Sequence, residues 1–477
     1  MSQHKDLTSG PIFSTIIKLV LPIIATSMVQ LAYQLTDMLW IGRVGSYAVA
    51  AVGTAGFYVW LGFSLIIISK VGAEVGVAMS LGQDNRADAR LYARNTLQIN
   101  VFTAILYGTL LLVFYQVLIR FFRLQDSGVI QQAESYLRVV AVGTLFAFIN
   151  PVFTGIYNGM GQSKVPFYIN SIGLIANIIL DPLLIFGLGP IPTLGVIGAA
   201  IATVVSQGLV TIVFLIHFLG KGAPFPKISF FSPMHKKIVK TIVQYGFPVA
   251  LQSGLFTIFA MLIARLIATW GPIPIAVQKV GSHIEALSWM TAGGFSSALS
   301  AFVGQNYGAG KWDRIQKGYL AGMITVTGIG LIATILLVFF AKPIFSLFIP
   351  EPEALKYGVV YLQILGLSQI FMSWEIATAG SFNGLGRTIP PSVISIVFTG
   401  LRVPLAYFLA LSTTLGLNGV WWSMSITSII KGIIMVVWFV VLLHRHPSAL
   451  KVQIVWQSIF RWNFKFLRDK RCIGGKS

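Results

Sequence analysis

Long apolar runs recur along the whole chain, and this pattern leaves few folds open to it. A helix needs roughly 20 predominantly apolar residues to cross the hydrocarbon core of a bilayer. Runs of at least that length, separated by short loops with glycine, proline or basic residues, number twelve: 14–42, 47–80, 95–122, 132–160, 166–188, 194–220, 239–269, 273–306, 315–345, 355–384, 390–412 and 416–443. The pattern predicts an all-α integral membrane protein with twelve transmembrane helices.

The composition supports this fold class. The chain is 56% hydrophobic and 10% charged, with a mean hydropathy of +0.81, whereas a soluble globular protein carries about 25% charged residues. The polar first ten residues lead directly into the first run, so we expect no cleavable signal peptide. The single cysteine, Cys472, excludes an internal disulfide and a cysteine-based metal site.

The formal net charge of +20 would suit a nucleic-acid partner, but the placement of the basic residues indicates a membrane surface. They gather in 86–94, 221–240, 311–317 and the tail, which share one face if both termini are cytoplasmic, as the positive-inside rule requires. The exceptions are fewer: Arg120, Arg123, Lys342 and Lys356. The tail 451–471 alternates apolar and basic residues, which predicts an interfacial segment on anionic lipid. We expect a cytoplasmic-membrane protein with no nucleic-acid partner.

The chain contains an internal duplication. Short patterns recur in the same order at offsets of about 220 to 226 residues: Asn158-Gly-Met-Gly161 with Asn383-Gly-Leu-Gly386, Pro22 with Pro248, Gly82-Gln83 with Gly304-Gln305, and Gly195-x-x-Gly198 with Gly416-x-x-Gly419. An even number of spans per half makes the repeat parallel, with a pseudo-two-fold axis along the membrane normal. The predicted division is a six-helix lobe at 1–220, a cytoplasmic linker at 221–238, a second six-helix lobe at 239–443, and a basic amphipathic cytoplasmic tail at 444–477.

Two aspartates lie inside apolar runs: Asp37 in the first and Asp181 in the fifth. A charged side chain at membrane depth costs ~2.5–3.5 kcal/mol on insertion scales, so such residues are usually functional or paired. Tyr33 precedes Asp37 by four residues and shares its helix face. Pro22, further upstream, leaves the Lys18 carbonyl without its helical partner and marks a site where the helix can bend. The alternative is that each aspartate only anchors a neighbouring helix through hydrogen bonds.

Further oxygen donors accompany Asp181. Asn177 lies one helical turn before it on the same face, and the sixth run contributes Thr203. Carboxylate, amide and hydroxyl oxygens are ligands that hard cations prefer. The set Asp37, Asn177, Asp181 and Thr203 suits Na⁺, and its two carboxylates also suit a shared proton.

Other polar residues inside the runs give weaker signals. Lys70 and Glu74 are four residues apart, which favours a structural ion pair. Asn150 and Asn158 are candidates for lining a substrate cavity or for coupling. In the second half acids and bases nearly balance, so we expect mutual neutralisation, with a coupling role for Glu375 as the alternative: Glu375, His283, Glu285, Lys279, Arg265 and Arg402.

The two halves differ in their acids. The position that matches Asn177 carries Arg402, and only apolar residues such as Ile263 lie near the match to Asp37. The seventh run has no acid at all. The acidic site therefore belongs to the first half alone.

These features together resemble the multidrug and toxic compound extrusion (MATE) family of secondary transporters. The resemblance covers nearly the whole chain, through the duplicated halves and the segments TDMLWIG, NGMGQS, NIILDPLLIFG and NGLGRTIPPS. It implies a V-shaped pair of six-helix lobes that pumps organic cations or other amphiphiles outward, driven by inward flow of Na⁺ or H⁺. The NorM-like branch of the family usually has a glutamate in its seventh span. Because the seventh run has no acid here, the chain resembles the DinF-like and archaeal branches instead. That resemblance implies an ion site at Asp37, Asn177, Asp181 and Thr203, with Tyr33 beside it and a bend at Pro22.

The sequence favours a transporter over an enzyme and leaves two kinds of transport open. The leading hypothesis is multidrug efflux by cation (H⁺ or Na⁺)/drug antiport with alternating access. It implies a monomer in the lipid bilayer that transports small amphiphilic, cationic substrates and needs no cofactor besides the coupling ion. The alternative is a flippase for a lipid-linked pyrophosphate precursor. That would require Arg and Lys in the cavity, which Lys279, Arg265 and Arg402 favour and the first-half acids oppose. An enzyme is not expected, because metal-ligand spacing, phosphate-binding loops and nucleophile elbows are missing from the sequence.

Overall fold

The computed structural model describes residues 6–122, 126–187, 192–220, 224–225, 230, 232–348 and 351–444, and every regular element within them is a helix. The predicted interfacial segment 451–471 and much of the predicted linker 221–238 lie outside these residues. The helices of the first half are α1 (Ile12–Val44), α2 (Ser46–Gly82), α3 (Arg86–Arg120), α4 (Ser127–Gly159), α5 (Lys164–Phe186) and α6 (Gly195–Leu219). Those of the second half are α7 (Lys236–Ile267), the 3₁₀ turn η1 (Ala268–Trp270), α8 (Pro272–Gly308), α9 (Trp312–Phe339), α10 (Ala341–Ser346), α11 (Pro352–Gly366), α12 (Gln369–Gly384), α13 (Ile389–Leu411) and α14 (Leu417–His444).

The helices fit twelve membrane-crossing segments. Ten described helices are long and apolar enough to span, and α11 with α12 makes an eleventh span that bends by 50° at its break. The twelfth is α8, which has 37 residues and is less apolar because it carries Lys279, His283 and Glu285. The predicted span 355–384 corresponds to α11 and α12 together, and the helix breaks within it, between Gly366 and Gln369.

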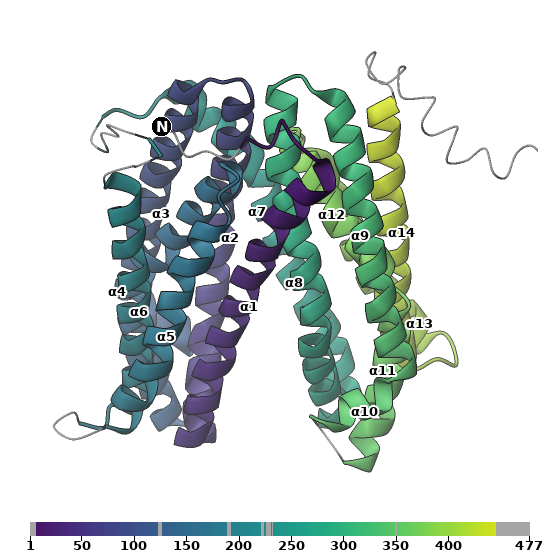
Figure 1. Cartoon of the computed structure of the whole chain (residues 1–477). Helices are drawn as coiled ribbons and strands as arrows, with labels where there is room; N and C mark the ends of the chain where they lie inside the picture. Colours follow the sequence, from purple (N-terminus) through teal and green to yellow (C-terminus); the bar gives the residue numbers. More distant parts are fainter. Residues whose placement is uncertain are drawn as a thin grey trace, which may run out of the picture.

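The two halves form two bundles that stand side by side and diverge toward the bottom of the view in Figure 1. In the first bundle, α1 to α6, α2 packs on α3 and α4, α4 on α6, and α5 on α1 and α6. In the second bundle, α7 to α14, α12 packs on α8, α9 and α14, and α13 packs on α14 and α7. The bundles meet where α2 contacts α7 and α8, and where α1 contacts α8. The predicted two-lobed arrangement is confirmed.

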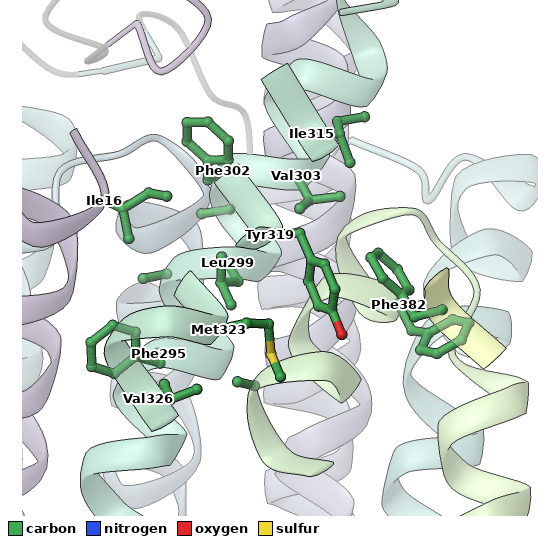
Figure 2. Packing of buried hydrophobic residues seen from close by; sticks show 14 of the residues in the cluster. Ile16, Phe295, Leu299, Phe302, Val303, Ile315, Tyr319, Met323, Val326 and Phe382 are labelled. Atoms are coloured by element: carbon green, nitrogen blue, oxygen red, sulfur yellow. The ribbon is translucent and has the colours of Figure 1, made fainter. Parts of the chain in front are cut away.

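Helix α1 belongs to both bundles. Its first half buries Ile16, Leu19 and Ile23 in a hydrophobic cluster built mainly from α8, α9, α12 and α14. Figure 2 shows Ile16 on the side of Leu299 and Phe302 of α8. Its second half buries Ile41 in a cluster of the first bundle. The helix therefore crosses from one bundle to the other, as the diagonal course of α1 in Figure 1 shows.

The duplicated Gly-Gln pattern explains how α2 and α8 approach each other. A Cβ atom on Gly82 would overlap the carbonyl oxygen of Gln305, and one on Gly308 would overlap that of Met79. Only glycine leaves room for backbones this close. We call this contact, formed by Met79 and Gly82 of α2 with Gln305 and Gly308 of α8, the seam. It lies at the end of the molecule where the described chain begins, because the backbone N–H of Leu7 donates to Gln305 Oε1 at 3.0 Å.

Candidate functional site

The predicted first-half residues meet between α1, α5 and α6. The Thr203 hydroxyl on α6 donates to Asp37 Oδ2 on α1 at 3.4 Å, and the Tyr33 hydroxyl donates to the Thr203 carbonyl at 3.4 Å. On α5, Asn177 Nδ2 donates to Asp181 Oδ1 at 3.0 Å. The carboxyl groups of Asp37 and Asp181 lie side by side, within hydrogen-bonding reach of each other. Residues from three separate helices thus converge on one point.

The interior of this cluster contains buried oxygen atoms without hydrogen-bond partners. Asn177 and Asp181 have no exposed surface. Among the described residues, the buried atoms without a hydrogen-bond partner include Asp37 Oδ1, Asp181 Oδ2, Asn177 Oδ1 and Ser206 Oγ. Buried polar atoms nearly always have a partner, so several orphaned oxygens in one place call for an explanation. A set of two carboxylates, an amide and hydroxyls fits a hard cation or a shared proton.

Sequence reasoning missed Ser206. It follows Thr203 by three residues on α6 and is fully buried. Residues three apart share a helix face, so the spacing from Thr203 could have identified Ser206 as a second polar group at the same site.

Prolines lie within both acid-bearing helices. Pro22 stands inside α1 and Pro182 directly follows Asp181 inside α5. Each proline lacks an N–H and so leaves one carbonyl of the preceding turn without its helical partner. In α1 this weak point lies in the segment packed on the second bundle, upstream of Asp37.

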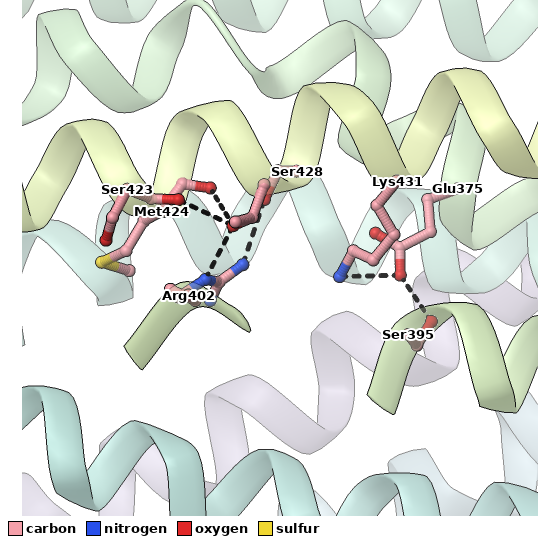
Figure 3. A network of polar contacts seen from close by, with 8 residues as sticks. Glu375, Ser395, Arg402, Ser423, Met424, Ser428 and Lys431 are labelled. Atoms are coloured by element: carbon pink, nitrogen blue, oxygen red, sulfur yellow. Dashed lines mark hydrogen bonds and ion pairs between the residues drawn. The ribbon is translucent and has the colours of Figure 1, made fainter. Parts of the chain in front are cut away.

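The second bundle holds a different polar cluster, which Figure 3 shows. Lys431 Nζ on α14 pairs with Glu375 Oε1 on α12 at 2.9 Å, and the Ser395 hydroxyl donates to the same oxygen at 2.9 Å. Arg402 on α13 donates to the hydroxyls of α14, from Nε to Thr427 at 3.1 Å and from Nη2 to Ser428 at 3.2 Å. Glu375 is thus neutralised within the bundle, by a lysine outside the set of residues expected to balance one another.

The partner of Glu375 was not identified from the sequence. Lys431 is 6% exposed and lies within a helix that carries no Asp, Glu or Arg. A lysine inside a membrane span indicates an acidic partner on a neighbouring helix, because charged residues at membrane depth usually pair with one another.

The remaining first-half candidates lie away from the two aspartates. Asn150 of α4 bonds α6, donating to Gln207 Oε1 at 2.8 Å and accepting from the Thr211 hydroxyl at 2.8 Å. Asn158, near the end of α4, donates from Nδ2 to the Ser297 hydroxyl of α8 at 3.2 Å. Their roles in a cavity or in coupling stay predictions.

The expected ion pair between Lys70 and Glu74 does not form, although the structure describes both residues. Glu74 Oε2 instead accepts a hydrogen bond from the Ser297 hydroxyl at 2.9 Å. Glu74 is 7% exposed because α2 turns this face toward α8 and the second bundle. Helical spacing placed the two residues on one face but could not say what that face packs against.

Comparisons with known proteins agree with the duplicated architecture. The family model described as MatE matches residues 22–183 and again 248–408. A probable multidrug resistance protein NorM from Thermotoga maritima is 27% identical over 429 residues, covering 89% of this chain and 91% of that protein. The probable multidrug resistance protein YoeA from Bacillus subtilis is 26% identical over 409 residues, covering 84% and 88%.

A solved structure extends the likeness to three dimensions. A MOP superfamily transporter from Pyrococcus furiosus, for which a reverse polarity of the binding pocket is described, superposes with a TM-score of 0.87 at 25% identity and covers 94% of this chain and 99% of that chain. The family model occupies most of both halves, and the fold agrees over nearly the full length. The chain therefore belongs to the multidrug and toxic compound extrusion (MATE) family and is a multi-pass membrane transporter, not an enzyme.

Proposed function

We propose that this protein exports small amphiphilic cations across the cytoplasmic membrane in exchange for H⁺ or Na⁺, and that the coupling ion binds at Asp37, Asn177, Asp181 and Thr203. One observation carries the proposal: the carboxyl groups of Asp37 on α1 and Asp181 on α5 lie side by side, each with a buried oxygen that has no hydrogen-bond partner. The multidrug resistance names of the NorM and YoeA relatives support the substrate class.

Binding of one cation or proton would relieve a local electrostatic conflict. Two carboxylates that share a buried site repel each other, and a positive charge between them removes that repulsion. The Thr203 hydroxyl and the Asn177 amide complete the ligands with neutral dipoles. A cationic substrate that approaches the same negative charge competes with the ion, which gives exchange rather than co-transport.

The course of α1 supports a link between ion binding and movement. Asp37 belongs to the half of α1 in the first bundle, whereas Ile16 and Leu19 anchor the other half in the second bundle. Ion binding or release at Asp37 therefore acts on a helix that packs against both bundles. Pro22 supplies the position where this helix bends. Transport requires that ion and substrate bind the two conformations with different affinity.

The proposal includes an orientation. With both termini cytoplasmic, the seam closes the cytoplasmic end and the bundles diverge toward the outside. The division into lobes at 1–220 and 239–443, the linker 221–238, the tail 444–477 and the monomeric state belong to the same proposal.

Transport of a fluorescent cation into proteoliposomes, with Na⁺ and H⁺ gradients imposed separately, tests the function. We expect one gradient to drive uptake, and Asp37→Asn and Asp181→Asn each to abolish it while the protein still inserts. Thr144→Val is the matched control, because it changes a buried polar residue of the same bundle whose hydroxyl donates to the Val140 carbonyl of its own helix. Undiminished transport by either aspartate variant would refute the ion site.

The flippase alternative has one observation in its favour, the buried cations Arg402 and Lys431. Lys431 already pairs with Glu375, and Arg402 donates to two hydroxyls inside the bundle. Both cations therefore already have partners, whereas phosphate binding would require cations that are available to the ligand. Growth of a flippase-deficient strain after expression of this protein would reverse the choice, and we expect no such rescue.

A further inference from the structure

We propose that Glu74, Ser297 and Asn158 form a latch that holds the two bundles together at the seam, and that its strength sets the balance between the two access states. The inference rests on the proposed alternating-access cycle. It assigns a role to a buried acid that the ion site does not use.

The three residues form a continuous hydrogen-bond chain between the bundles. Asn158 Nδ2 on α4 donates to the Ser297 hydroxyl on α8 at 3.2 Å, and that hydroxyl donates to Glu74 Oε2 on α2 at 2.9 Å. Asn158 and Glu74 both belong to the first bundle, so the first bundle grips one hydroxyl of the second bundle from two helices. Separation of the bundles at this end breaks both bonds.

The latch lies among contacts that keep water away. Gln305 Nε2 of α8 donates to the carbonyl of Gly159, the residue after Asn158, at 2.9 Å. Around them, glycines let the backbones of the two bundles touch, as Gly82 does on Gln305 and Gly246 does on Ile68. Asn158 is 2% and Glu74 7% exposed. In this dry setting a hydrogen bond to a carboxylate is stronger than one between neutral groups.

The charges around Glu74 are few. The positive charge of Lys70, on the same helix, acts on Glu74 from beyond ion-pair distance. Ser297 and Ser300 of α8 supply hydroxyl groups to the Glu74 carboxylate. Asn158 is the polar residue of α4 at this point. Because no cation neutralises Glu74 directly, its hydrogen bond to the second bundle is the main interaction of the carboxylate, and that interaction exists only while the seam is closed.

The duplication makes this latch one-sided. The first-half pattern Asn158-Gly159 bonds Ser297 and Gln305 of the other bundle. In the second-half copy, Asn383 Oδ1 is a buried atom without a hydrogen-bond partner. The repeated pattern therefore supplies the shape of both turns. Within the part of the chain that the structure describes, cross-bundle hydrogen bonds come from the first copy and none from the second.

Double electron–electron resonance on the full-length protein in nanodiscs measures the latch directly. Spin labels attached through Lys164→Cys and Lys317→Cys, in a Cys472→Ser background, report the separation of the bundles, since both lysines are exposed and one lies in each bundle. A hydrogen bond to a charged group is strong enough to shift an equilibrium about tenfold. We expect Glu74→Ala and Ser297→Ala each to raise the ratio of separated to closed molecules about tenfold.

Conservative variants separate a latch from simple packing. Ser297→Thr keeps the hydroxyl and should stay near wild type. The double variant Glu74→Ala/Ser297→Ala should shift the ratio no further than Ser297→Ala alone, because Ser297→Ala already removes the bond to Glu74. The matched control is Ser80→Ala, since the buried Ser80 hydroxyl of α2 bonds only the Gly76 carbonyl of its own helix. An unchanged ratio in both alanine variants, or an equal shift in Ser80→Ala, overturns the proposal.

The readout is independent of transport. If the aspartate variants transport normally, the ion site fails while the distance measurement still tests the latch. If the latch variants leave the distances unchanged while the aspartate variants lose transport, the latch alone fails.

Discussion

The two bundles share one architectural plan but use charge in opposite ways. In α4 of the first bundle, Asn150 forms neutral bonds with Gln207 and Thr211 of α6. Counting from the repeated Asn-Gly-x-Gly pattern, the corresponding residue of α12 is Glu375, which pairs with Lys431 of α14. The same helix contact is therefore neutral in one bundle and ionic in the other.

The converse holds at the acidic site. Asp37 and Asp181 lie side by side, and no cation among the described residues pairs with either of them. Ile263 and Arg402 stand near the matching positions of the second bundle. Glu375 is already neutralised by the ammonium group of Lys431. Asp37 and Asp181 have no such group, so under the proposed function a mobile ion would neutralise them. The comparison teaches that two halves with one scaffold can use charge differently: the first brings two carboxyl groups together, and the second neutralises Glu375 internally.

The largest expected effect is on transport. Asp181→Asn should reduce cation-driven uptake to the level of empty liposomes, because it removes a carboxylate from the ion site. Glu375→Gln/Lys431→Met, which removes the ion pair of the second bundle as a unit, should leave uptake driven by the same gradient. Equal losses in both variants would break the contrast between the bundles.

The next largest effect is on stability and concerns the second bundle. Lys431→Met leaves Glu375 buried without its cation, which costs about 3–5 kcal/mol in comparable buried pairs. We expect a clear fall in the thermal unfolding temperature in detergent. Most of the loss should return in Glu375→Gln/Lys431→Met, because the double variant leaves no uncompensated charge. A Lys431→Met protein as stable as wild type would mean that Glu375 finds another partner.

A smaller effect is expected at a ligand of the first bundle. Thr203→Val removes the hydroxyl that donates to Asp37 and should weaken the apparent affinity for the coupling ion about tenfold. The measurement is the ion concentration or pH that gives half-maximal uptake. Thr427→Val, which removes a hydroxyl bonded to Arg402 of the other bundle, should leave that value unchanged.

The smallest effect is expected for Tyr33→Phe. The tyrosine hydroxyl donates to the Thr203 carbonyl across 3.4 Å, a long and therefore weak bond. Its loss should change the half-maximal ion concentration by less than about fivefold, corresponding to roughly 1 kcal/mol or less. A change as large as that of Thr203→Val would make Tyr33 a direct ligand rather than a neighbour of the site.

Much of the candidate site could be predicted because polar residues are so sparse in the apolar runs. Asp37, Asn177, Asp181 and Thr203 were each visible as exceptions to a lipid-facing pattern, and the structure brings them together. Ser206 was within reach of the same reasoning. The partners of Glu74 and Glu375 were not, because Ser297 and Lys431 are distant in sequence and each lies on another helix.

The sequence by itself determined the number of spans, the duplication and the positions of the acids, because hydropathy, glycine patterns and charge are local properties of the chain. The tertiary structure alone decided which acids are neutralised, where α1 passes from one bundle to the other, and that Glu74 bonds across the seam. Those outcomes depend on which faces of distant helices meet. In a membrane many apolar faces are chemically alike, so the choice among them is made by packing and by the few buried polar groups.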